Sequence, residues 1–177
     1  MKILIGYSTD TKTLEAFQAK GHDVWTCDIL PAEHSNHLQC DVWEVANDNW
    51  DLGIFHPMCT FLTVSAAWAF KDPDYDRYPT VGYHQRVKEG TLTGSARRQA
   101  RDEAINNFKQ LDTLLYPHAI ENPAPSFISS MYGKPDQTIQ PYDFGDNASK
   151  RTGLWLKGLK PLTPTKRIEG RFVQYNG

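Results

Sequence analysis

A cysteine follows a short apolar segment and is the side chain best placed to act as a nucleophile. Residues 50–60 read as a buried strand over 52–55, which stops at a His-Pro-Met turn and presents Cys59 just past its C-terminal end. Because only the thiolate form attacks carbon, a helix starting after this turn would favour the anion through its dipole and free amide groups. The alternative role for Cys59 is that of a small buried apolar side chain.

Two later segments add a carboxylate and two cations. Residues 119–120 form a short apolar run that ends in Glu121 and Asn122, and Lys150 and Arg151 follow a Tyr-Asp-Phe-Gly turn. A carboxyl group at an apolar strand end has a raised pKa when it is desolvated, which suits a proton donor working near neutral pH. The guanidinium of Arg151 can grip an anion or a base edge in two places. A structural ion pair between Glu121 and either cation, and a solvated pair of cations on a turn, are the alternatives.

In this order and at these distances, the three segments resemble motifs of the cytosine-5 DNA methyltransferases. The corresponding motifs of that family are a Pro-Cys loop, a Glu-Asn-Val strand end and a Gln-x-Arg-x-Arg segment, and the resemblance covers roughly residues 2–158. Short, phage-associated methyltransferase-like proteins resemble the chain more closely. The chain departs from the family pattern at Pro123, which replaces the usual Val, and at Lys150 and Arg151, which preserve only part of the third motif.

The resemblance implies a role for each of these residues. Cys59 would add to ring carbon 6 of a pyrimidine and create an enamine that accepts a methyl group at position 5. Glu121 would activate the ring at nitrogen 3 as general acid, and Arg151 would steer the substrate. The remaining substrate-binding residues would be Pro57, Asn122 and Lys150.

S-adenosylmethionine is the cofactor that the resemblance implies, and the sequence supports two opposite conclusions about it. Asp28, at the end of the second expected strand, matches the family's ribose-binding acid, and Asp41 matches the acid that meets the adenine amino group. The glycine-rich turn after the first strand is eroded, because residues 6–12 hold one glycine placed too early. Retained and lost cofactor binding both stay open, and each acid also fits a turn-capping role. The cofactor-binding residues would be Tyr7, Asp28, Asp41 and His56.

The spacing of apolar residues predicts the fold. Runs of strand length at residues 3–7, 24–27, 52–55 and 119–120 alternate with helical stretches, which indicates βα units and a parallel sheet. We expect a single α/β domain over residues 1–158, with a Rossmann-like, doubly wound, mainly parallel sheet of the class I methyltransferase-like kind. An extended basic tail is expected over residues 159–177.

Two helices and one long loop are expected between the strands. Residues 14–19 form a helix that ends where Gly21 can take the left-handed conformation. A second helix is expected from about Ser95 to Tyr116. Residues 71–94 are rich in Pro, Gly and Asp, which predicts a long mobile loop of the kind that acts as a lid. The buried face of the second helix is expected to carry Ala96, Ala100, Ala104, Phe108, Leu111 and Leu115, with Arg97, Arg98 and Arg101 mostly outside it.

The composition of the chain bears on where the protein is expected in the cell and on whether it binds a metal. The 177 residues, 40% of them hydrophobic, are ordinary for one soluble domain. No apolar run approaches the ~18 residues of a membrane span and no signal peptide precedes the first strand, so a cytoplasmic protein without a membrane partner is expected. The three cysteines are expected to be free thiols. The cluster His34, His37 and Cys40 fits none of the paired zinc patterns, so no metal is expected.

Charge and length shape the expected substrate. The net charge of −2 argues against strong binding of duplex DNA by the chain alone. Full-length family members carry a target-recognition domain, for which we expect no room after Arg151. A nucleotide or single-stranded DNA is therefore the expected substrate, unless a second copy of the chain or a DNA-binding partner assists. The alternative function is a catalytically degenerate methyltransferase fold that binds a nucleotide, nucleic acid or protein, for instance as a phage accessory or counter-defence factor, and the eroded glycine turn favours it.

Overall fold

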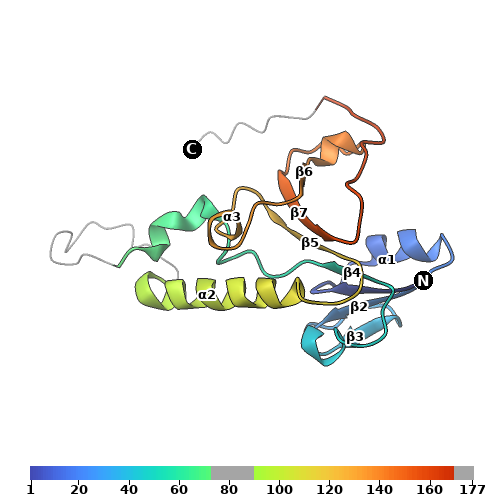
Figure 1. The fold of residues 1–177 in the computed structure, drawn as a ribbon, viewed down its shortest axis with the longest axis horizontal. Coiled ribbons are helices and arrows are strands. Elements are labelled where there is room, and N and C mark those ends of the chain that lie inside the picture. The colour runs from blue at the N-terminus through green and yellow to red at the C-terminus, as the bar shows by residue number, and fades with distance from the viewer. Residues whose placement is uncertain (73–89, 170–177) are drawn as a thin grey trace.

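A computed structural model describes residues 1–72 and 90–169, and seven strands in these ranges form one sheet in the order β3-β2-β1-β4-β5-β7-β6 (Figure 1). The strands are β1 (Lys2–Gly6), β2 (Asp23–Asp28), β3 (His37–Gln39), β4 (Leu52–Phe55), β5 (His118–Pro123), β6 (Gln137–Ile139) and β7 (Thr152–Lys157). The helices are α1 (Thr11–Gln18), α2 (Gly94–Leu111) and α3 (Ile128–Met131), with 3-10 helices over Val42–Glu44, Val64–Phe70 and Pro141–Asp143. No helix among the described residues is both long and apolar enough to span a bilayer.

The sheet is parallel from β3 through β5 and antiparallel at β7. The chain moves outward from β1 to β2 and β3 and then returns to place β4 on the other side of β1, so the strand order reverses between β1 and β4. The carboxyl ends of strands beside such a reversal form the crevice in which open α/β sheets bind ligands. Because β7 runs opposite to β5, its N-terminal end lies at this same edge. The predicted Rossmann-like, mainly parallel α/β fold is confirmed.

Helices cover both faces of the sheet because the side chains of a strand alternate in direction. Ile3 and Ile5 of β1 pack with Leu14 of α1 on one face. Leu4, between them, packs with Phe108 of α2 in the larger cluster on the other face. Figure 1 shows α1 and α2 on opposite sides of the sheet. Burial on both faces explains why β1 reads as a continuous apolar run in the sequence.

Local signals at both ends of α1 agree with the prediction. Asp10 caps its start, because its carboxylate accepts hydrogen bonds from the backbone N–H groups of Lys12 and Thr13 at 3.2 and 2.9 Å. Gly21 follows its end with a φ of +81°, the left-handed conformation that the sequence predicted. The short connection brings the chain straight into β2.

The second helix differs from the prediction at both ends of its buried face. It ends at Leu111, and the turn that follows buries Leu114 and leaves Leu115 96% exposed. Phe108 and Leu111 lie in the core as predicted. The assignment of Arg97 to the outer face is wrong, because that side chain is only 5% exposed. The helical stripe therefore continues through an arginine whose surroundings make burial possible, as described below.

Residues 160–169 of the predicted tail run beside β6 and the 3-10 helix that follows it. The side chain of Gln137 donates to the carbonyl oxygen of Leu162 and accepts from its N–H, both at 2.7 Å. The Ile168 N–H donates to the Tyr142 carbonyl oxygen at 2.9 Å. Residues 170–177 and most of the loop expected over 71–94, namely 73–89, lie outside the described part of the chain.

Candidate active site

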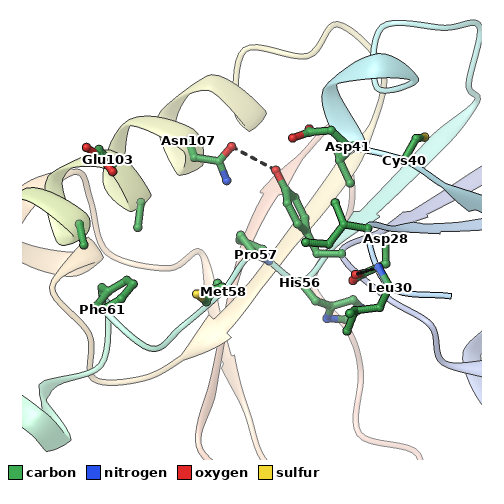
Figure 2. Close-up of a pocket in the computed structure, with 15 residues that line it drawn as sticks. Asp28, Leu30, Cys40, Asp41, His56, Pro57, Met58, Phe61, Glu103 and Asn107 are labelled. Atoms are coloured by element: carbon green, nitrogen blue, oxygen red, sulfur yellow. Dashed lines mark hydrogen bonds between the residues drawn. The ribbon is translucent and has the colours of Figure 1, made fainter. Parts of the chain in front are cut away.

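A cavity of about 600 Å³ lies at the carboxyl ends of β1, β2 and β4, where the strand order reverses. Small-molecule sites typically enclose about 300–1,000 Å³ with mostly apolar walls and a few polar groups. Figure 2 shows the strand ends on one side of the cavity and α2, with Glu103 and Asn107, on the other. The predicted site residues in its walls are Tyr7, Asp28, Asp41, His56 and Pro57.

Tyr7 stands where a glycine is expected and places an aromatic ring in the cavity. Its φ of 58° is the left-handed conformation that glycine adopts most easily. The Tyr7 hydroxyl donates to Asn107 Oδ1 at 3.1 Å, and Trp43 Nε1 donates to the same oxygen at 2.8 Å. Burial raises the pKa of the Tyr7 hydroxyl, so it stays a neutral donor. Asn107 and Trp43 were not predicted as site residues, because their partner lies far away in the sequence.

Gly6 explains why the glycine of this turn comes too early for a cofactor loop. A Cβ atom at Gly6 would lie 2.6 Å from Cδ1 of Phe55, which is closer than packed atoms approach. Phe55 is fully buried at the end of the neighbouring strand β4. The glycine is therefore required for packing β1 against β4, and it leaves the ligand-facing position to Tyr7.

Asp28 and Asp41 line the cavity and also cap turns, so both roles considered for them are geometrically compatible. Asp28 Oδ1 accepts from the N–H of Leu30 at 2.9 Å. Asp41 Oδ1 accepts from the N–H of Trp43 at 2.9 Å and forms a capping box with Glu44. Each carboxylate is thus held by its own local backbone while facing the cavity.

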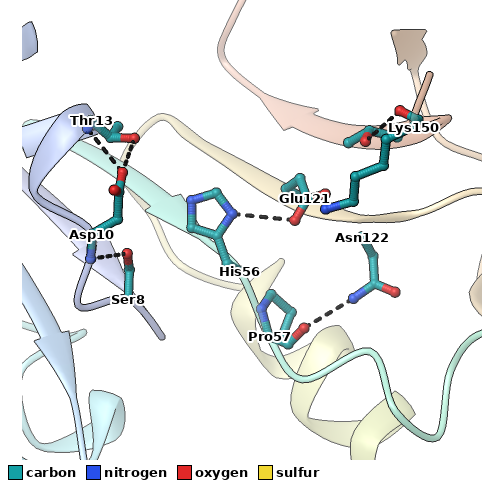
Figure 3. A network of polar contacts seen from close by, with 9 residues as sticks. Ser8, Asp10, Thr13, His56, Pro57, Glu121, Asn122 and Lys150 are labelled. Carbon is teal, nitrogen blue, oxygen red and sulfur yellow. Dashed lines mark hydrogen bonds and ion pairs between the residues drawn. The ribbon is translucent and has the colours of Figure 1, made fainter. Parts of the chain in front are cut away.

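Glu121 pairs with His56 across the ends of β4 and β5. His56 Nδ1 lies 3.2 Å from Glu121 Oε2, and the two side chains are 35% and 21% exposed (Figure 3). The register of the strands accounts for this pair, because Phe55 is the partner of Ile120 and the next residues follow side by side. Neither Lys150 nor Arg151 forms an ion pair with Glu121 in the described part of the chain. The alternative of a structural ion pair between Glu121 and one of these cations is therefore wrong about the partner, which is His56.

Asn122 ties the segment that carries the cysteine to β5. Its Nδ2 donates to the Pro57 carbonyl oxygen at 3.0 Å, and the side chain is fully buried (Figure 3). Its Oδ1 is buried as well and has no hydrogen-bond partner within the described residues. Because His56 and Pro57 are both bound to consecutive residues of β5, the start of the Cys59 loop is fixed against Glu121.

Cys59 begins a turn, and the helix expected directly after it is absent. Its carbonyl oxygen accepts from the N–H groups of Leu62 and Thr63 at 2.9 and 3.1 Å. The chain is then extended at Thr63, which forms a β-bridge with Ser126, and a 3-10 helix begins only at Val64. The prediction of a helix start at Cys59 is therefore wrong, so the dipole expected from such a helix does not act on this half-buried thiol.

Arg97 of α2 holds the Cys59 loop from the other side and was missed as a site residue. Its guanidinium donates to the carbonyl oxygens of Thr60 and Leu92 at 3.0 and 3.3 Å. The group also lies over the rings of Phe61 and Phe70, 5.3 and 5.0 Å from their centroids. The only signal in the sequence was helical spacing, because Arg97 lies on the stripe that continues to Phe108.

Lys150 and Arg151 lie at the same edge of the sheet, just before β7. The Arg151 carbonyl oxygen accepts from the Ala124 N–H at 3.0 Å, and its side chain is exposed. Figure 3 shows the Lys150 side chain directed toward Glu121 and Asn122. The antiparallel pairing of β7 with β5 thus brings both predicted cations to the strand end that carries the predicted acid.

Two further observations concern identity and metal binding. No protein-family model and no curated protein sequence matches the chain. The described residues include no group of three or more His, Cys, Asp and Glu side chains placed to hold a metal ion. His34 and His37 instead lie 3.3 and 2.8 Å from the hydroxyl of Thr26.

Proposed function

We propose that this protein is a pyrimidine 5-position methyltransferase-like enzyme in which Cys59 is the nucleophile. The observation that carries the proposal is the pair of bonds from His56 and Pro57 to Glu121 and Asn122, at 3.2 and 3.0 Å. These bonds join the segment with the thiol to the segment with the acid, as a shared pocket requires. The strand order, with β7 antiparallel between β5 and β6, is also that of the class I methyltransferase-like fold and supports the same reading.

The residues at the strand ends have complementary tasks in this reaction. The Cys59 sulfur bonds to ring carbon 6, which moves electron density to carbon 5. Glu121 Oε2 is bound to His56, which leaves Oε1 to hydrogen-bond ring nitrogen 3 and to supply a proton there. Lys150 and Arg151 carry the positive charge at this edge and steer an anionic substrate.

The cavity beside this site fits S-adenosylmethionine, the methyl donor of the reaction. Asp28 and Asp41 offer carboxylate oxygens at two strand ends, suited to ribose hydroxyls and an adenine amino group. The Tyr7 ring supplies an apolar surface between them and α2. The volume of about 600 Å³ and the mostly apolar walls suit a nucleoside-sized ligand.

A nucleotide or a single-stranded oligonucleotide is the substrate class that this edge favours. Extruding a base from duplex DNA costs a few kcal/mol, roughly, and needs contacts to the surrounding duplex. The net charge of the chain is −2, which gives little general attraction to duplex DNA. Duplex DNA becomes a substrate only with help from a second copy or a DNA-binding partner.

Trapping of the covalent intermediate tests the proposal. The protein is incubated with a 5-fluorocytosine oligonucleotide or nucleotide and S-adenosylmethionine, and a covalent adduct is sought by intact mass spectrometry. Fluorine at carbon 5 blocks release, so an adduct on Cys59 is expected with the wild type and none with Cys59→Ser. Cys40→Ser is the matched control and should retain the adduct. Absence of any adduct on wild-type Cys59, with either substrate, would overturn the proposed chemistry.

A second candidate function is a binding module that has lost methyl transfer. The Tyr7 ring supports it, because a side chain stands at the left-handed position where a cofactor loop would use glycine. Calorimetry with S-adenosylmethionine separates the candidates. The enzyme predicts binding that Asp28→Ala and Asp41→Ala abolish. No heat with the wild type, together with tight nucleotide binding that survives Cys59→Ser, favours the binding module.

A further inference from the structure

Two cysteines that the proposed reaction does not use lie side by side next to the cavity, and one of them, Cys40, lines it. The Sγ atoms of Cys27 and Cys40 are 3.7 Å apart, and the Cys27 thiol also lies 3.5 Å from the Cys40 carbonyl oxygen. Cys27 is fully buried near the end of β2, whereas Cys40 follows β3 and is half-buried. The sulfur atoms of a disulfide are separated by about 2 Å, so an approach of roughly 1.7 Å from the observed 3.7 Å joins them.

We propose that Cys27 and Cys40 form a modification site that is oxidised to an intramolecular disulfide by small-molecule disulfides of the glutathione type. The inference rests on the proximity of the two sulfur atoms and on their unequal exposure. It is independent of the methyl-transfer chemistry, since Cys59 takes no part in it.

The exposure of the two thiols sets the order of the steps. Cys40 lines the cavity and meets the oxidant first. Its thiolate attacks one sulfur of glutathione disulfide, forming a mixed disulfide and releasing one glutathione thiolate. Cys27 then loses its proton to the first released glutathione thiolate, and the resulting Cys27 thiolate attacks Cys40 Sγ and expels the second glutathione thiolate. The two thiol protons pass to the two released thiolates, so the protein loses two hydrogen atoms and the glutathione disulfide is reduced to two thiols.

The environment of Cys27 protects it from direct attack by reagents, and its proximity to Cys40 makes it the resolving thiol. Burial, with the adjacent Cys40 thiol as the next cause, raises the pKa of the Cys27 thiol to about 12. Cys27 therefore stays protonated and unreactive toward bulky reagents until Cys40 is modified. The mixed disulfide then places a reactive sulfur beside it.

The disulfide would change ligand binding in the cavity through Asp28 and Asp41, the two acids in the cavity wall. Asp28 follows Cys27, Asp41 follows Cys40, and both carboxylates line the cavity. Shortening the sulfur–sulfur distance from 3.7 Å draws the segment after β3 toward β2 and fixes the spacing of the two acids. Oxidation is therefore expected to change the ligand affinity of the cavity, a consequence that rests on the proposed function.

Disulfide mapping tests the modification itself. The full chain is equilibrated with glutathione disulfide, free thiols are alkylated under denaturing conditions, and peptides are mapped by mass spectrometry. The expected product has a Cys27–Cys40 bond and one alkylated residue, Cys59. Cys59→Ser should give the same bond, and Cys40→Ser should leave Cys27 free. A stable glutathione adduct on Cys40 with Cys27 still free, a disulfide that includes Cys59, or three free thiols would each overturn the proposal.

Hydrogen exchange tests the effect on the cavity without relying on any ligand. The backbone amide hydrogens of residues 37–44 should exchange more slowly in the oxidised protein, by about fivefold or more, because the new bond restricts local opening. Unchanged exchange there would contradict the coupling to the cavity. S-adenosylmethionine calorimetry on both redox forms adds the ligand test. If neither form binds the cofactor, the proposed function fails while the mapped disulfide still stands.

Discussion

The carboxyl edge of the sheet is held together in two different ways. Around β2 and β3, the acids bind backbone groups within their own turns, at sequence separations of two residues for Asp28 with Leu30 and for Asp41 with Trp43. Around β4 and β5, the contacts of His56 and Asn122 join residues that are 65 apart. The first half is built from local turns and the second from the packing of distant segments.

This difference has a physical consequence for the two halves of the proposed site. A local cap keeps its geometry as long as its own turn is formed, so its loss affects one strand end. A contact between distant segments holds only when both elements are packed, so its loss loosens the loop that carries Cys59. We therefore expect substitutions on the Cys59 side to affect thiol reactivity and stability together, and those on the acid side to lower stability without changing the reactivity of the Cys59 thiol.

Removing the Arg97 side chain should have the largest effect on stability and on the reactivity of Cys59. Arg97→Ala deletes a buried side chain between Phe61 and Phe70 and frees the Thr60 carbonyl, so the free energy of unfolding should fall by about 2–4 kcal/mol. Cys59 should also react faster with maleimide. Urea unfolding and mapped alkylation rates provide the measurements. Arg98→Ala is the matched control, because it removes an exposed pair with Asp72 and one hydrogen bond to the Phe70 carbonyl oxygen and should cost less, about 1 kcal/mol. Equal destabilisation by the two variants would contradict the role assigned to Arg97.

Asn122→Ala should have the next largest effect. The variant removes the bond to the Pro57 carbonyl, and the stability should fall by about 1–3 kcal/mol. Cys59 alkylation should again accelerate, since the start of its loop is released from β5. Asn147→Ala, on an exposed turn, serves as control and should change stability by about 0.5 kcal/mol at most. An unchanged alkylation rate in Asn122→Ala would show that Pro57 is held without this bond.

Asp41→Ala tests the local half of the site. Loss of the capping box should reduce the free energy of unfolding by about 1 kcal/mol. Because the cap acts within its own turn, the alkylation rate of Cys59 should stay at the wild-type value. Asp41→Asn, which keeps a capping oxygen, should restore most of the stability. Faster alkylation of Cys59 in Asp41→Ala would remove the distinction between the two halves.

The smallest expected effect is on the pH dependence of the free energy of unfolding, through the Asp10 cap of α1. The backbone N–H of Thr13, with smaller help from other groups, lowers the pKa of Asp10 below its ordinary value of 3.8. The folded state then binds fewer protons than the unfolded state, so this stabilisation is present above pH 3.8 and is lost as the pH falls through the folded pKa. Asp10→Asn should flatten this part of the urea-unfolding profile between pH 5 and pH 2, by about 1 kcal/mol or less. A profile identical to the wild type would contradict the assignment.

The parts of the fold that were predicted correctly share a local cause. β4 was predicted with its observed bounds because an apolar run and a proline turn delimit it, and the end of α1 was predicted from Gly21 alone. Three strands, β3, β6 and β7, were not predicted. In β3 and β6, three partly exposed residues each carry no recognisable period, so strand length and burial limited what the apolar pattern could predict there. That cause does not apply to β7, which has six mostly buried residues.

In the candidate site too, features with a local cause were predicted and contacts between distant segments were not. Asp28 and Asp41 lie in the cavity because strand ends meet at one edge, which the order of elements implied. The alternative role for Glu121, an ion pair, named Lys150 or Arg151 as the partner, whereas the observed partner is His56, set by the register of β4 with β5. Arg97 was missed because a charged side chain reads as exposed until the aromatic rings around it are known.

The sequence alone determined the α/β class, the strand that leads to Cys59 and the acids at the strand ends. These features depend on apolar periodicity and turn residues, which act over a few neighbouring positions. Folding in three dimensions settles the partners of Glu121 and Asn122, the burial of Arg97 and the approach of the Cys27 and Cys40 sulfur atoms. Those contacts depend on which elements pack side by side, and no short segment carries that information.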